Sequence, residues 1–177
     1  MNKTIKAIAT ATLAAATVIG TSAKAVNVDP DHFELGKAVI STGVELKINP
    51  TKCFGQTNKA LGWYWSAKNE LVICQENAYR PGTEVRWTAE DFDTLRHEAQ
   101  HLIQDCVDGS QNGELESVYQ EPIRLGKSVL GNAGIQRIAE AYSDKSNHII
   151  VMEVEAFAVA ALNDPLEQVN DIKTYCF

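Results

Sequence analysis

The clearest periodic pattern in the chain is a helical one that begins at Thr88. Apolar residues recur there at spacings of three and four, and Asp91 follows three residues after Thr88, as in a capping box. Asp108-Gly109 is expected to end this helix, which should run to about Cys106. The apolar stripe that should face the core comprises Phe92, Leu95, Ala99, Leu102, Ile103 and Cys106.

A second pattern, over residues 61–76, is typical of a β-hairpin. The segment from Gly62 to Ser66 is rich in aromatic residues, Lys68-Asn69 supplies a turn, and Glu70 to Cys74 has the length and composition of a strand. We expect the strand 70–74 to offer the sheet edge to which an extended peptide adds.

The remaining patterns complete a prediction of the α+β class. Residues 26–50 form a mixed lead-in, in which Asp29-Pro30-Asp31 is expected to cap a short helix, while His32 should lie on the surface. A small N-terminal hairpin or sheet is then followed by the helix from 88 and by a helical C-terminal part, all in one domain. The C-terminal helices are expected at 122–130, at 134–142 after Gly131-Asn132, and at 147–162, the last one ending at Asn163-Asp164-Pro165.

The first 25 residues have the pattern of a signal peptide. Lys3 and Lys6 precede an apolar run over 7–20, and Ala23-Lys24-Ala25 fits a signal-peptidase site. The run is shorter than the roughly 20 apolar residues that span a bilayer, so we expect cleavage rather than anchoring. The mature domain is then 26–177, secreted or periplasmic, with no membrane association after the signal is removed.

The net charge of the chain narrows the possible partners. The chain has 16 basic and 23 acidic residues, and removing residues 1–25 takes away three lysines, which leaves 13 − 23 = −10. Nucleic acid and anionic membranes require basic surfaces, so neither is an expected partner, and we expect a monomer.

Four cysteines in an exported chain predict two disulfides. Of three possible connectivities we favour Cys53–Cys74 and Cys106–Cys176.

The expected helix from 88 carries the motif His97-Glu98-Ala99-Gln100-His101. Positions i and i+4 lie one above the other on a helix, so both imidazoles can reach one ion, with Glu98 close enough to take a proton from a water on it. This pattern predicts a zinc hydrolase. Because the histidines point almost opposite the apolar stripe, they either face a second layer of structure or form a chance motif in solvent.

A catalytic zinc needs three protein ligands and one open position. The expected helix 147–162 is apolar from Ile149 to Leu162 except for Glu153 and Glu155, and a buried carboxylate requires compensation. Small residues follow Glu153 on its helix face and would let another helix approach closely, so Glu153 is the preferred ligand over Glu155. Asp105 is a weaker alternative, because three ligands from one helix crowd the geometry.

On these residues the chain resembles the gluzincin type of zincin metallopeptidase, in which a later helix supplies a glutamate ligand, often in an E-x-x-A setting. Here Glu153-Val154-Glu155-Ala156 matches that setting. The resemblance implies one Zn²⁺ per chain held by His97, His101 and Glu153, with Glu98 as general base and proton shuttle acting on a peptide or protein substrate. Thermolysin-like enzymes have an aspartate where this chain has Phe157.

Two further side chains are candidates for stabilising the oxyanion of the reaction, Tyr142 and His148, because both lie near the ligand helix in sequence. The competing hypothesis is a non-enzymatic exported module, either a metal-binding pseudoprotease or a disulfide-linked binding protein. It is motivated by the small size of the chain and by the missing aspartate.

Overall fold

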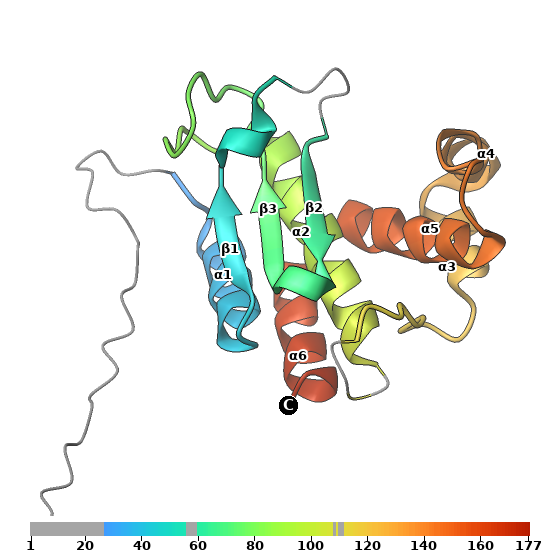
Figure 1. Ribbon diagram of the computed structural model, residues 1–177. Helices are drawn as coiled ribbons and strands as arrows, with labels where there is room; N and C mark the ends of the chain where they lie inside the picture. The colour runs from blue at the N-terminus through green and yellow to red at the C-terminus, as the bar shows by residue number, and fades with distance from the viewer. Residues whose placement is uncertain (1–26, 56–59, 108, 110–111) are drawn as a thin grey trace, which may run out of the picture.

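The protein is seen here as a computed structural model that describes residues 27–55, 60–107, 109 and 112–177 (Figure 1). The predicted signal peptide, 1–25, and the predicted mature terminus Val26 lie outside the described residues, as does Asp108. The helices are α1 (Pro30–Ser41), η1 (Thr51–Cys53), η2 (Ser66–Lys68), α2 (Ala89–Cys106), α3 (Pro122–Val129), α4 (Gly131–Ala141), α5 (Asn147–Leu162) and α6 (Pro165–Tyr175). The strands are β1 (Glu45–Ile48), β2 (Gly62–Trp65) and β3 (Glu70–Ile73).

The sheet contains the predicted hairpin and one strand that was not predicted. Strands β2 and β3 pair antiparallel, whereas β1 pairs parallel with β3, so that the strand order is β1-β3-β2. The central strand is therefore β3, and the expectation that 70–74 offers a free edge is wrong, because both sides of that strand are already paired. The edges are β1 and β2.

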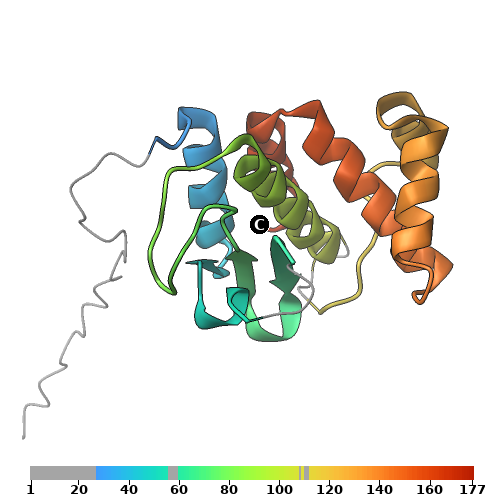
Figure 2. The same cartoon turned by 90° about the horizontal axis from the view of Figure 1, so that it is seen from above.

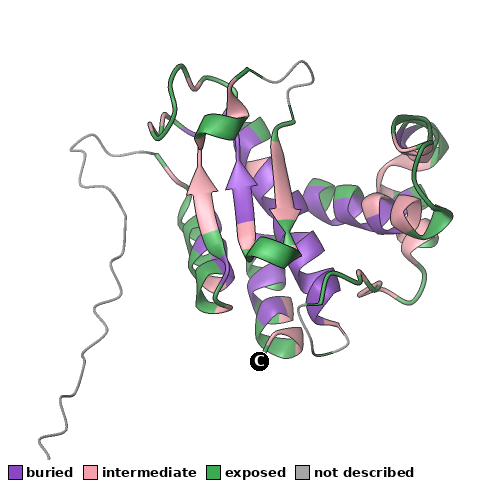
Figure 3. Ribbon diagram, viewed as in Figure 1, coloured by how far each residue is buried: buried purple, intermediate pink, exposed green. Residues whose placement is uncertain are grey.

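Helix α2 lies at the centre of the fold. Thr88 and Asp91 form the predicted capping box, and the predicted end at Cys106 is confirmed. The α-helices of the described residues lie on one side of the sheet, with α1 and α2 against it and α5 and α6 on the far side of α2 (Figure 2). As a result α2 is buried around most of its circumference, and so is much of β3 (Figure 3).

A glycine lets β2 approach α2 closely. A Cβ at Gly62 would lie 2.6 Å from the Thr94 methyl group, 2.7 Å from the Val72 carbonyl oxygen and 3.1 Å from Cγ of Glu98. Any side chain at this position would thus push the edge strand away from the HExxH motif.

The helical C-terminal part agrees with the prediction except at two places. The bounds of α5 are those predicted, but α4 begins at Gly131 rather than at 134. Helix α5 is not the last one, because Asn163 adopts a left-handed conformation (φ 57°) and Asp164 then caps a new helix with Pro165 in its first turn. This helix, α6, packs against α1 and α2.

Two disulfides fasten the domain. Both favoured pairs, Cys53–Cys74 and Cys106–Cys176, are confirmed. The first ties η1 to the end of β3, and the second ties the end of α2 to the residue after α6. Disulfides persist in oxidising surroundings, so the protein belongs to such a compartment. No helix among the described residues is long and apolar enough to cross a membrane.

A buried arginine joins α1, α2 and α5. Arg96 donates a hydrogen bond to the Ala160 carbonyl (2.8 Å), and its guanidinium also contacts Nε2 of His32 and the carboxylate of Asp93. The expectation that His32 lies on the surface is wrong, since it is only 5% exposed and packs against the Phe92 ring. Burial and then the positive charge of Arg96 lower the pKa of His32 below its ordinary value of 6.5.

The His32–Arg96 contact predicts acid sensitivity. Because the pKa of His32 is lower in the folded state, the unfolded chain binds a proton more readily, and the free energy of unfolding should fall as pH drops below 6.5. In His32→Gln the side-chain oxygen can still accept from Arg96 but cannot titrate. Urea unfolding at pH 7.5 and 5.5 should show a smaller acid loss for this variant, and an equal loss in both proteins would contradict the prediction.

Candidate metal centre

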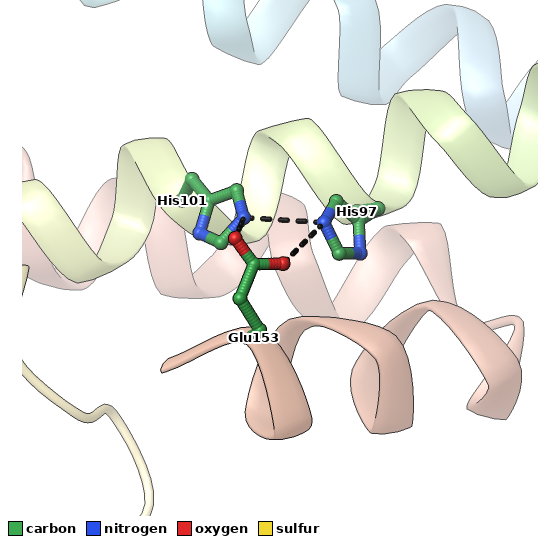
Figure 4. A group of neighbouring side chains, drawn as sticks. All are labelled: His97, His101 and Glu153. Carbon is green, nitrogen blue, oxygen red and sulfur yellow. Dashed lines mark hydrogen bonds and ion pairs between the residues drawn. The ribbon is translucent and has the colours of Figure 1, made fainter. Parts of the chain in front are cut away.

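Helices α2 and α5 bring together two imidazoles and one carboxylate (Figure 4). Nε2 of His101 lies 3.1 Å from Nε2 of His97, and the two nitrogens lie 3.6 and 3.3 Å from Oε1 and Oε2 of Glu153. The three ligand atoms lie within 4.8 Å of one another. The histidines therefore face a second layer of structure, α5, and not bulk solvent.

This group could hold a metal ion. The side chains of His97, His101 and Glu153 are each only 9 to 12% exposed, and Oε2 of Glu153 is buried without a hydrogen-bond donor among the described residues. A buried carboxylate oxygen of this kind is costly unless a cation compensates it. The two helices thus supply three ligand atoms close enough together to bind one cation.

The electrostatics of the group also call for a positive charge at its centre. Burial would raise the pKa of Glu153, but the two histidines outweigh it and lower that pKa to about 2. Burial likewise opposes a charged His101, yet hydrogen bonding to Glu153 and the negative charges of Glu98 and Glu153 raise its pKa to about 9. Without a metal ion, a proton on His101 takes the place of the cation.

Glu98 lies beside the three converging side chains but is not one of them. It is 7% exposed, and desolvation raises its pKa, although the neighbouring histidines and the backbone N–H of Tyr64 act in the opposite direction. The Tyr64 hydroxyl donates to Asp105 at 2.8 Å, which fixes β2 against α2. Glu98 is thus a carboxylate at the border between the motif helix and the edge strand.

Glu155, the alternative ligand, is not part of the metal group and instead forms hydrogen bonds that hold neighbouring segments together. It is fully buried, and its oxygens accept hydrogen bonds from Gln100 and Gln104 and from the hydroxyl of Ser117. The backbone N–H groups of Val118 and Tyr119 also donate to it, at 3.1 and 3.2 Å. No lysine or arginine side chain is among these donors. Glu155 joins α5, α2 and the segment before α3.

The two histidines are supported differently. Nδ1 of His101 lies 2.8 Å from Oε1 of Gln104, whose amide nitrogen donates to Glu155 and to the Met152 carbonyl. An acceptor at Nδ1 keeps the proton there and leaves Nε2 free to bind a metal. His97 has no such partner: its Nδ1 is buried without an acceptor among the described residues, and the Phe157 ring packs on its ring at 4.3 Å.

The structure brings one of the two oxyanion candidates to the site. Tyr142 is half-buried, and burial together with the charge and side-chain interaction of Glu153 raises its pKa above the ordinary value. His148 is exposed, and its Nε2 contacts the Leu115 carbonyl oxygen at 2.6 Å, so its ring is engaged away from the three ligands. Asp105, the weaker ligand alternative, accepts from Tyr64 and from the backbone N–H of Gly113.

The sequence pattern did not reveal the buried amide side chains beside the motif histidines, of which Gln104 contacts His101. Gln100 and Gln104 each follow a motif histidine by three residues, and both are completely buried. Amide side chains at i+3 from each histidine, on a helix that also has a full apolar stripe, were an available signal that α2 is covered on every side. That Gln104 contacts His101 while Gln100 contacts Glu155 depends on α5 and could not be read from spacing.

The described chain is therefore an α+β domain, held by two disulfides and built around a buried group of two imidazoles and one carboxylate. It belongs to the family described as a domain of unknown function, DUF8637, whose model matches residues 25–177. No curated protein matches the chain, and no solved structure matches it.

The contact between Gln104 and His101 predicts an effect on metal affinity. In Gln104→Met the acceptor at Nδ1 is lost at similar volume, so zinc affinity measured by competition with a chelator should fall about 10- to 100-fold. Gln100→Met is the matched control, because it also loses a hydrogen bond to Glu155 but has no contact with a histidine nitrogen. Equal losses in the two variants would show that Gln104 acts only through Glu155.

Proposed function

We propose that this protein is an exported zinc-dependent metallopeptidase, secreted or periplasmic, that hydrolyses peptide bonds. The observation that carries the proposal is the convergence of His97, His101 and Glu153 on one point, with the carboxylate of Glu98 beside it. A metal group of this composition with an adjacent acid is the arrangement of metal-assisted hydrolysis.

The donor set and the spacing of the two imidazole nitrogens favour zinc. Two atoms bound to one tetrahedral zinc at about 2.05 Å lie about 3.3 Å apart. Here the two Nε2 atoms lie 3.1 Å apart, close to that value. They lie 3.3 and 3.6 Å from two different oxygens of Glu153, and three ligand atoms, one from each residue, lie within 4.8 Å of one another. Two imidazoles and one carboxylate, with a fourth position left for water, are also a common donor set of catalytic zinc.

Each nearby residue has a role in this mechanism. Zinc, when bound, would polarise the substrate carbonyl and make a water molecule acidic. The Glu98 carboxylate takes a proton from water and passes it to the leaving amine, and its burial favours holding the proton between those steps. Tyr142 keeps its hydroxyl proton, because its pKa is raised, and donates a hydrogen bond to the developing oxyanion.

The substrate is expected along β2 rather than β3. Among the described strands, β2 forms an edge of the sheet, and the backbone N–H of Tyr64 in this strand donates to the carboxylate of Glu98. An extended peptide that adds to this edge would bring its backbone to the catalytic carboxylate.

The role of Glu98 predicts a separation of binding from turnover. Glu98→Gln should retain one zinc per chain, measured by elemental analysis, while cleavage of a peptide library falls at least about 100-fold. Glu90→Gln, an exposed position on the same helix, is the control and should keep both properties.

Two outcomes would contradict the proposal. Full cleavage by Glu98→Gln would exclude this residue as the base. A wild-type protein that binds zinc but cleaves no member of the library would favour the pseudoprotease hypothesis, which the unsupported Nδ1 of His97 makes worth testing.

The metal-free pKa values predict how zinc binding depends on pH. Because His101 has a pKa of about 9 and is protonated at neutral pH, zinc must displace a proton. Zinc affinity should therefore rise about tenfold per pH unit from 6 to 8 and level off near 9. An affinity that does not change over this range would mean that no proton is displaced.

A further inference from the structure

A pocket of about 310 Å³ lies beside the metal centre, between α4 and α5. Two of its lining residues reach the ligands: the Phe157 ring packs on His97, and Tyr142 interacts with Glu153. A molecule in this pocket would thus adjoin the atoms at which hydrolysis is proposed. Its lining includes Leu130, Arg137, Ile138, Ala141, Tyr142 and Phe157.

The pocket combines apolar walls with a single positive charge. Leu130, Ile138, Ala141 and Phe157 provide the walls, and Phe157 is 37% exposed. Arg137 is the only charged group in the lining, in a chain that is acidic as a whole.

Arg137 is available to a ligand. Glu140, the other charged residue of α4, accepts a hydrogen bond from Gln136 at 2.8 Å, and no ion pair joins it to Arg137 among the described residues. The pocket therefore favours a ligand with an apolar body and one carboxylate. Arg137 would repel a cationic ligand. A strongly polar ligand would lose hydration against the apolar walls without gaining hydrogen bonds there.

We propose that Arg137 binds the free C-terminal carboxylate of a peptide whose terminal apolar residue fills this pocket, so that the protein removes residues from peptide C-termini. This inference rests on the proposed function. A C-terminal apolar residue carries both features at once, whereas an internal acidic side chain would leave the apolar walls unfilled. In the reaction a C–N bond breaks, the oxygen of water bonds to the carbonyl carbon, and one water proton goes to the leaving amine.

The test compares three acetylated pentapeptides: one ending in leucine as the free acid, the same peptide as its C-terminal amide, and an amide with an internal glutamate. For the wild type, kcat/KM should be about 10- to 100-fold higher for the free acid than for either amide. Arg137→Gln should remove this preference. Arg124→Gln, an exposed arginine on α3 that loses the same charge, should keep it.

A binding measurement separates this inference from the proposed function. Titration calorimetry of the zinc-loaded Glu98→Gln protein, with and without Arg137→Gln, should show tighter binding of the free acid only when Arg137 is present. If no peptide is cleaved but this selectivity holds, the peptidase proposal fails and the pocket assignment stands. If peptides are cleaved with no acid preference, or if Arg137→Gln has no effect on binding, the pocket assignment is overturned. Preference for the internal glutamate would also overturn it.

Discussion

The structure depends on one contact, in which the Glu153 carboxylate of α5 is buried against two imidazoles of α2. An ionised carboxylate in this position is tolerated only if positive charge accompanies it, and the low pKa of Glu153 and the high pKa of His101 express that requirement. Other features serve to keep the two helices together. Glu155 of α5 accepts hydrogen bonds from amides of α2, and Arg96 of α2 donates to the Ala160 carbonyl of α5.

The surroundings of the metal centre are asymmetric. On the His101 side, Gln104 and Glu155 form a chain of hydrogen bonds that extends to the backbone before α3. On the His97 side, the Phe157 ring packs on the imidazole, and Nδ1 of His97 has no acceptor among the described residues. Phe157 also lines the neighbouring pocket. Phe157 therefore joins the metal centre to the pocket in which we propose that a substrate binds.

Sequence reasoning succeeded where the signal was local. The capping box at Thr88, the hairpin over 61–76, both disulfides and the burial of Glu153 follow from spacing and from the cost of burying charge. It failed where pairing is set by distant parts of the chain. Four residues of β1 gain their strand conformation from parallel pairing with β3, and that pairing also removes the edge expected at 70–74. The orienting role of Gln104 and the burial of His32 likewise depend on helices far away in sequence.

The central claim is that His97, His101 and Glu153 hold one metal ion between α2 and α5. Anomalous diffraction at the zinc absorption edge, from crystals of protein purified without added metal or chelator, tests it most directly. The account predicts one strong anomalous peak about 2.0 to 2.2 Å from Nε2 of each histidine and from a Glu153 oxygen. Absence of such a peak, with a protonated His101 paired directly to Glu153, would contradict it.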